Sequence, residues 1–204
     1  YACFAETAAG ESDTIATAHN ADDNAETLLL NLARGMGPRG AGGIPRRRDK
    51  LRRPLLGVSR AEVEFLCKVF HLDWVEDSTN AEETYTRNRL RRRVLPELRE
   101  INPRLSDAVS RFTASMALEN DFMQAQAEAL LRAARTAGGL SLPVLRAAHP
   151  ALLHRALEIY LQPLGRMSYE HLLRAADCVL CGGGLTLPGG AMLSVKQDTL
   201  TVMD

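Results

Sequence analysis

Apolar and polar positions over the first hundred residues predict strands and helices in alternation. Residues 14–18 form a short β-prone apolar run, and residues 22–34 follow with the apolar spacing of a helix that Gly35 closes. Such alternation is typical of an α/β domain. The other elements predicted here are a helix over residues 1–9, a strand ending at residues 54–56, a helix from Ser59 to about residue 71, a strand over residues 74–75, and a helix over residues 84–100 that bends or restarts at Pro96.

The pattern changes beyond residue 104. Apolar residues recur there at three- or four-residue steps, which predicts one long helix reaching about Arg135. Two further helices are predicted over residues 150–161 and 168–180, and short strands over residues 185–202. The predicted organisation is an α/β domain over residues 1–103, a helical domain over residues 104–184 and a short β element over residues 185–204.

Three carboxylates and one imidazole lie where the first predicted strand gives way to a helix: His19, Asp22, Asp23 and Glu26. In open α/β sheets, the carboxyl end of a strand is where ligands bind. A helix N-terminus attracts anions, so acids crowded there indicate that Mg²⁺ or an ammonium group joins the site. A structural reading stays open, because Asp23 and Glu26 have the spacing of a capping box and Asp22 favours the helix dipole.

The formal net charge is zero, but the charges are unevenly distributed. Nine basic residues and one acid lie between Arg34 and Arg60, and five arginines without an acid lie between Arg87 and Arg93. Local fields attract a polyanion, and guanidinium groups suit phosphate geometry, so these runs indicate a nucleic-acid partner. A solvated charged face is the alternative for each run.

The cysteines and the absence of some signals predict a cytoplasmic protein. Cys3, Cys67, Cys178 and Cys181 do not have the spacing of a disulfide framework, and no signal peptide or 18-residue apolar run is found. Cys178 and Cys181 form a single CxxC pair, which we interpret as core packing. The chain begins at Tyr1 without a Met, and we expect that an N-terminal part is missing.

Three motifs occur in one order along the chain, and together they resemble the tRNA(Ile)-lysidine synthases of the N-type ATP pyrophosphatase (PP-loop) superfamily. The resemblance covers essentially the whole chain and implies a partial Rossmann-like, adenine nucleotide α-hydrolase-like domain followed by an α-helical domain. The motifs are His19-Asn20-Ala21-Asp22-Asp23-Asn24-Ala25-Glu26-Thr27, then Arg34-Gly35-Met36-Gly37-Pro38-Arg39-Gly40 with Gly43-Ile44-Pro45, then Asp77-Ser78-Thr79-Asn80 with Tyr85-Thr86-Arg87-Asn88-Arg89, and Arg53-Pro54-Leu55-Leu56 lies before the last.

The resemblance implies that ATP activates C2 of the wobble cytidine of tRNA(Ile) with a CAU anticodon, and that free lysine then displaces AMP to form lysidine. It implies catalytic roles for His19, Asp22, Asp23 and Arg87, with Asp22 and Asp23 holding either Mg²⁺ or the lysine ammonium group. The wider assignments are cofactor contacts at Asp22, Asp23, Asn24, Glu26 and Thr27; a loop near ATP and cytidine at Gly35, Gly37, Arg39 and Gly40; and tRNA contacts at Arg46, Arg47, Arg48, Arg52, Asn88, Arg89 and Arg91. Arg53 is expected to be a generic phosphate contact, like Arg46, Arg47, Arg48 and Arg52.

The chain departs from the family pattern in lacking the Ser-Gly-Gly-x-Asp-Ser loop that binds pyrophosphate. We therefore expect this chain to be inactive by itself and its parent to be active. Family members are often dimers. Two other interpretations stay open: a tRNA 2-thiolating enzyme of the same superfamily, which usually carries paired cysteines, and a non-catalytic tRNA-binding module.

Overall fold

The computed structural model describes residues 13–74, 83–165 and 167–203. The chain divides into two compact units, Tyr1–Leu118 and Glu119–Asp204. The predicted helix over residues 1–9, Cys3, Val75 and the motif Asp77-Ser78-Thr79-Asn80 lie outside the described residues, as does the side chain of Tyr85.

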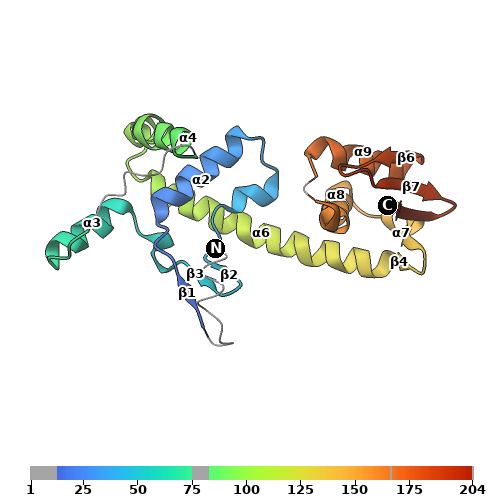
Figure 1. Cartoon of the computed structure of the whole chain (residues 1–204), viewed down its shortest axis with the longest axis horizontal. Coiled ribbons are helices and arrows are strands. Elements are labelled where there is room, and N and C mark those ends of the chain that lie inside the picture. The colour runs from blue at the N-terminus through green and yellow to red at the C-terminus, as the bar shows by residue number, and fades with distance from the viewer. Residues whose placement is uncertain (1–12, 75–82, 166, 204) are drawn as a thin grey trace. The chain divides into compact units, whose positions relative to one another are not determined.

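Unit 1 contains a small mixed sheet with the strand order β1-β3-β2 (Figure 1). Strand β1 (Ile15–Ala16) is parallel to β3 (Leu51–Arg52), which confirms the strand predicted over residues 14–18. Strand β2 (Arg47–Arg48) pairs with β3 in the antiparallel sense. The strand predicted to end at residues 54–56 is wrong, because β3 ends at Arg52 and Pro54 opens the 3-10 helix η2 (Pro54–Gly57). Proline has a fixed φ and no N–H to donate, which suits a helical first turn and not a strand interior.

Helix α2 (Ala21–Ala33) follows β1 and ends in a Schellman motif. The Met36 N–H donates to the Asn31 carbonyl and the Gly35 N–H donates to the Leu32 carbonyl. Gly35 has a φ of +72°, so it closes the helix as predicted. Helix α3 (Arg60–Val69) begins at the predicted capping box of Ser59 and Glu62. The glycine-rich loop between α2 and β2 folds into the 3-10 helix η1 (Pro38–Gly42).

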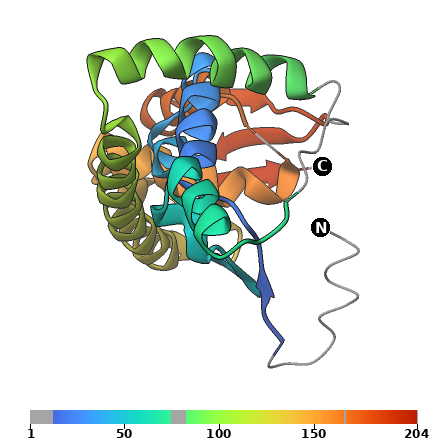
Figure 2. The same ribbon diagram turned by 90° about the vertical axis from the view of Figure 1, so that its left-hand side faces the viewer.

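The predicted helix over residues 84–100 is present as one continuous helical run with a wider turn inside it (Figure 2). Helix α4 (Glu83–Arg89) passes into the π-helical turn η3 (Leu90–Val94) and then into α5 (Leu95–Ile101). The Leu95 N–H donates to the Leu90 carbonyl, five residues back. The run therefore changes register just before Pro96, where the sequence predicts a bend.

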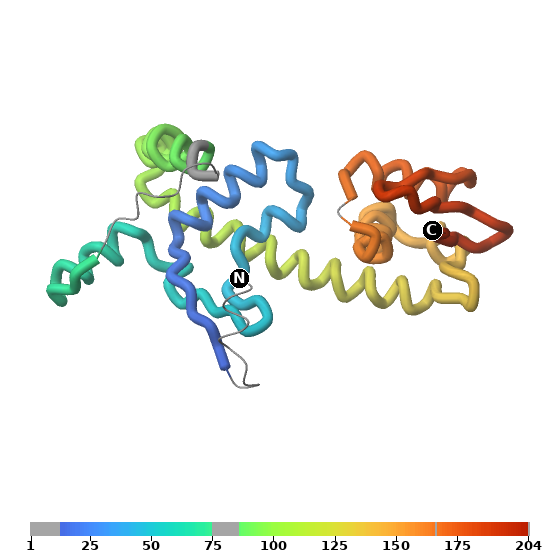
Figure 3. Tube along the Cα trace, viewed as in Figure 1, coloured from blue at the N-terminus to red at the C-terminus, as the bar shows by residue number. Residues whose placement is uncertain are grey.

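Unit 2 packs helices against a five-stranded antiparallel sheet with the order β4-β5-β8-β7-β6. The predicted long helix is α6 (Leu105–Ala134), which begins in unit 1 and ends in unit 2; the predicted helices over residues 150–161 and 168–180 correspond to α8 and α9 (Figure 3). The remaining elements are β4 (Arg135–Thr136), β5 (Gly139–Ser141), α7 (Leu142–Arg146), α8 (Pro150–Leu161), η4 (Gln162–Leu164), α9 (Tyr169–Cys181), β6 (Gly184–Thr186), β7 (Met192–Lys196) and β8 (Thr199–Met203).

The terminal strands are confirmed, but they belong to a larger sheet than the sequence predicts, because β5 pairs with β8 across a long stretch of chain. Strands β4 and β5 are two and three residues long, which is too short for a periodic signal. Within the described residues, no helix has the length and apolar character needed to cross a bilayer.

Candidate active site

The carboxyl end of β1 leads directly into α2 and carries most of the predicted site residues. The Thr17 N–H donates to the Arg52 carbonyl at 2.9 Å, which extends the β1–β3 pairing by one step. The Thr17 hydroxyl is 2.9 Å from Nδ1 of His19. The Ala21 N–H donates to the Val58 carbonyl at 2.9 Å, which fixes the start of α2 against the segment between η2 and α3. His19 and the acids of α2 therefore lie at the strand end, where α/β domains bind ligands.

The start of α2 is a capping box formed by Asn20 and Asp23. The Asp23 N–H donates to the Asn20 side chain at 3.0 Å, and the Asn20 N–H donates to Oδ2 of Asp23 at 2.9 Å. The capping box suggested for Asp23 and Glu26 is therefore wrong in register, because the helix begins at Ala21 and Asp23 is its third residue. Asp23 is thus both a helix cap and a candidate ligand.

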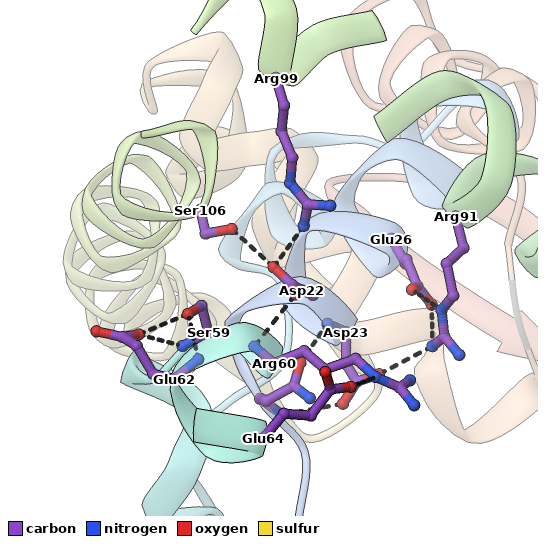
Figure 4. A network of polar contacts seen from close by, with 11 residues as sticks. Asp22, Asp23, Glu26, Ser59, Arg60, Glu62, Glu64, Arg91, Arg99 and Ser106 are labelled. Atoms are coloured by element: carbon purple, nitrogen blue, oxygen red, sulfur yellow. Dashed lines mark hydrogen bonds and ion pairs between the residues drawn. The ribbon is translucent and has the colours of Figure 1, made fainter. Parts of the chain in front are cut away.

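Asp22 is held by three donors from three separate elements (Figure 4). Its Oδ1 accepts hydrogen bonds from Nη2 of Arg99 at 2.8 Å and from Oγ of Ser106 at 2.7 Å. Its Oδ2 accepts the Arg60 N–H, at the start of α3, at 3.2 Å. The side chain is 13% exposed. Asp22 therefore joins α2 to α3, α5 and α6, with both carboxylate oxygens engaged.

Glu26 forms a bidentate ion pair with Arg91, as Figure 4 shows. Nε and Nη2 of Arg91 lie 2.5 and 3.0 Å from the two carboxylate oxygens, and Nη2 also lies 3.4 Å from Oδ1 of Asp23. The hydrogen bond to Glu26 raises the pKa of Arg91, against a smaller opposing effect of burial. Exposed fractions are 3% for the Glu26 side chain and 28% for Asp23, so Asp23 is the most accessible of the three acids.

Asn24 fastens the end of the glycine-rich loop to unit 1. Its buried Oδ1 accepts the Ile44 N–H at 2.8 Å, while its Nδ2 donates to Oγ1 of Thr113 at 3.0 Å. Gly43 has a φ of +64°, and a Cβ there would lie 2.3 Å from Oδ1 of Asn24. Only glycine fits this close approach. The Asn24 side chain and the close approach of Gly43 therefore hold the end of the loop against α2.

The other predicted loop residues surround η1. Gly35 closes α2, Gly37 precedes η1, and Arg39 lies on η1 with an exposed side chain. The Gly40 carbonyl accepts a hydrogen bond from Nδ2 of Asn31 at 3.3 Å. Thr27 is half-buried on α2, one residue after Glu26.

His19 has a lowered pKa. Burial is the largest cause; the Asp23 charge opposes it, and the charges of Arg53 and Arg87 lower the pKa further. The imidazole is therefore mostly neutral at neutral pH, and a neutral imidazole can donate from one nitrogen and accept at the other. Predicted residues from the first and third motifs, His19, Asp23 and Arg87, thus act on one another electrostatically.

Arg53, predicted as a generic phosphate contact, is instead a buried cation with 7% of its surface exposed. Its Nη1 donates to the Pro45 carbonyl at 2.7 Å, and its Nε has no hydrogen-bond partner within the described residues. Sequence reasoning missed Arg99, Ser106 and Thr113. No local pattern marks them, because their partners lie 77 to 89 residues away.

The predicted tRNA-contacting arginines fall into two groups. Arg46, Arg47 and Arg48 are exposed on and beside β2, while Arg52 donates to the carbonyls of Asp49 and Leu51 at 2.6 and 3.0 Å. Arg89 is exposed and Asn88 half-buried on α4, whereas Arg91 turns to the acids of α2.

The described residues contain no group of three or more His, Cys, Asp or Glu side chains arranged to hold a metal. Mg²⁺ is often bound through one or two carboxylates together with substrate phosphates. Asp23 fits that mode better than Asp22, because its side chain is 28% exposed against 13% for Asp22 and its contact with Arg91 is the longer one, at 3.4 Å.

Comparison with known proteins places residues 1–98 in a PP-loop domain. The chain is 37% identical to a tRNA(Ile)-lysidine synthase of Salinispora tropica, over 100% of this chain and 66% of that protein. It is 36% identical to the tRNA(Ile)-lysidine synthase of Salinispora arenicola, over 92% of this chain and 60% of that protein. The corresponding Pseudomonas aeruginosa protein is 41% identical over 66% of this chain and 31% of its own length. The chain thus spans two thirds or less of these relatives' lengths.

Proposed function

The chain belongs to the tRNA(Ile)-lysidine synthase family of PP-loop proteins, and on this premise we propose that the protein is an ATP-dependent C–N ligase that makes lysidine in tRNA(Ile). In the proposed first step, the C2 oxygen of the wobble cytidine attacks the α-phosphate of ATP and pyrophosphate leaves. In the second, the lysine side-chain amine attacks C2, the C2–O bond breaks, and AMP leaves with the oxygen. The CAU anticodon, free lysine, a cytoplasmic location and a homodimer belong to the same proposal.

The observation that carries this proposal is the unequal state of the carboxylates at the start of α2. Asp22 and Glu26 are 13% and 3% exposed and closely paired with Arg99 and Arg91, while Asp23 is 28% exposed and its Oδ1 lies 3.4 Å from Nη2 of Arg91. We propose that Asp23 is the carboxylate that meets the substrates, by pairing with the lysine ammonium group or by sharing Mg²⁺ with the triphosphate. Mg²⁺, when bound, would neutralise triphosphate charge. Asp22 would have a structural role, because its hydrogen bonds join α2 to α3, α5 and α6.

His19 and Arg87 are proposed to act beside Asp23. The charges of Arg87 and Asp23 both affect the pKa of His19, and the neutral imidazole is suited to hydrogen bonding with the nucleotide or the target base. Arg87 is exposed and positive, which suits a phosphate oxygen. The η1 loop, with Arg39 exposed, is proposed to lie near ATP and cytidine.

The exposed arginines of the β2 region are proposed to bind the tRNA backbone. Arg46, Arg47 and Arg48 are close together in sequence and exposed, which is the pattern of sequence-independent phosphate contacts. We assign Arg91 to ion pairs with the acids of α2 and not to the tRNA, because its guanidinium pairs with Glu26 and Asp23.

The direct test incubates the full-length gene product with ATP, lysine and tRNA(Ile). We expect AMP release only when all three are present, and a modified nucleoside with the mass of lysidine. A sulfur-containing nucleoside formed without lysine would instead establish a thiolating enzyme. Salt-dependent tRNA binding with no response to ATP would establish a non-catalytic module.

Variants separate chemistry from RNA binding. Asp23→Ala should abolish AMP formation and leave tRNA affinity nearly unchanged, while Asp107→Ala, an exposed acid on α6, is the matched control. Replacing Arg47 and Arg48 together should weaken tRNA binding and reduce its salt slope by about 2. Equal loss of both properties in both variants would refute these assignments.

A further inference from the structure

Two arginines from one helical run hold the acids at the start of α2. Arg91 lies in the π turn η3 and pairs with Glu26 and Asp23, whereas Arg99 lies in α5 and pairs with Asp22. In Figure 4 both guanidinium groups reach toward the same end of α2. Arg92 and Arg93, in the same run, are exposed and form no ion pair within the described residues. The run therefore uses selected arginines as internal counter-charges.

The π turn decides which arginines face α2. In an α-helix, residues eight positions apart point about 80° away from each other, because each residue turns the chain by about 100°. A π turn accommodates one extra residue, so Arg91 and Arg99 come within about 20° of a common direction. Two long side chains can then reach one short segment of α2 at the same time.

Pro96 gives a local reason for the wider turn. A proline inside a helix has no N–H to donate to the fourth residue before it, and its ring clashes with that residue's carbonyl, here Arg92. In this chain the turn directly before Pro96 is π-helical, with the Leu95 N–H donating to the Leu90 carbonyl. The wider turn thus lets the helix continue through Pro96 with a shift in its hydrogen-bond register.

We propose that the π turn Leu90–Val94, together with Pro96, is a positioning element of the active site, which aligns Arg91 and Arg99 as a clamp on the carboxylates of α2. This inference rests on the proposed function. Three carboxylates within five residues repel one another, and two guanidinium groups offset most of that repulsion. The clamp fixes Asp22 and Glu26 in the interior, and Arg91 also holds Asp23, the most exposed of the three acids, at 3.4 Å. Arg91 and Arg99 are therefore positioning residues.

The test compares two changes of chain length in the full-length protein. Deleting Arg92 removes the extra residue, and combining it with Pro96→Ala removes the clash that the wider turn relieves, so in this deletion variant the turn becomes α-helical and the clamp keeps its alignment. Inserting one alanine between Glu97 and Leu98 rotates Arg99 by about 100° relative to Arg91. We expect near wild-type kcat in the deletion variant and a fall of about 100-fold in the insertion variant, with tRNA affinity unchanged in both. Wild-type kcat in the insertion variant, or equal loss in both, would overturn the proposal.

A second measurement does not depend on activity. A double-mutant cycle with Asp22→Asn and Arg99→Gln, read by denaturant unfolding, reports the coupling between the two side chains. We expect coupling in the wild-type and Arg92-deletion backgrounds and none in the insertion background. If the wild-type protein forms no lysidine but shows this pattern, the proposed function fails and the clamp stands. Equal coupling in all three backgrounds would refute the clamp.

Discussion

The two units bury different kinds of side chain. In unit 2, large apolar side chains such as Leu140, Leu145, Leu157 and Leu200 form one cluster with exposed fractions of 2% or less. Among the described residues of unit 1, the buried apolar side chains are fewer and include several alanines, while polar groups take interior positions. The buried polar residues described in unit 1 are Asn24, Glu26, Arg53 and Thr113, against Arg155 in unit 2.

The described interiors therefore rely on different contacts: apolar packing in unit 2, and directional polar contacts to a larger extent in unit 1. Apolar burial stabilises a fold without fixing directions, whereas buried ion pairs and hydrogen bonds add little net stability but require defined positions. In unit 1, Asn24 fixes the end of the η1 loop through the Ile44 N–H, and Glu26 orients Arg91 beside Asp23.

The largest expected effect is in the core of unit 2. Leu157→Ala removes a fully buried side chain and should destabilise the protein by about 2–5 kcal/mol, because it leaves a cavity. Leu180→Ala, 52% exposed on α9, is the control and should cost about 0.5 kcal/mol. Denaturant unfolding measures both. A similar cost for the two variants would mean that unit 2 lacks a tightly packed core.

The next effect concerns the clamp in unit 1. Arg91→Ala leaves the buried Glu26 carboxylate without its partner and should cost about 1–3 kcal/mol, less than for a fully buried pair because Arg91 is 41% exposed. The control is Arg92→Ala, which changes an exposed side chain and should stay within about 0.5 kcal/mol. Unfolding free energies decide this, and an unchanged value for Arg91→Ala would show that the pair contributes nothing to unit 1.

A smaller loss is expected where Asn24 holds the loop. Asn24→Ala removes the acceptor of the Ile44 N–H and the donor to Thr113, and should cost about 1–2 kcal/mol. Hydrogen exchange of the Ile44 amide should accelerate together with this loss. Asn31→Ala removes only a longer hydrogen bond of 3.3 Å to Gly40 and serves as the milder comparison. Unchanged exchange at Ile44 would contradict the proposed anchoring.

The smallest effect is the pH dependence contributed by His19. Its pKa is lowered in the folded state, so the unfolded chain binds the proton first as pH falls below about 6.5. The stability that the neutral imidazole contributes is present above that pH and is lost as pH falls through the folded pKa. In the His19→Gln variant, the unfolding free energy should change less between pH 7 and pH 5 than it does in the wild-type protein. Parallel pH profiles for the two proteins would exclude this role.

Local sequence patterns predicted much of the fold correctly. The capping box of Ser59 and Glu62, the closing role of Gly35 and the long helix of residues 105–134 all follow from contacts within a few residues, and the structure confirms them. Helix α2 begins at Ala21, one residue before the predicted start. Its capping box is formed by Asn20 and Asp23 instead of Asp23 and Glu26. Strands β4 and β5 were missed because they are only two and three residues long; β4 pairs with neighbouring β5, and β5 pairs with distant β8.

The sequence by itself determined the chemical content of the site: acids and a histidine after a strand, a glycine-rich loop, and a run of arginines before a proline. Only the tertiary structure decided which of these groups meet. It turned Arg91 inward, engaged both oxygens of Asp22 and left Asp23 accessible. The physical reason is range: caps and turns depend on neighbours along the chain, whereas an ion pair between residues 22 and 99 depends on the whole packing of unit 1 and on one extra residue in a helical turn.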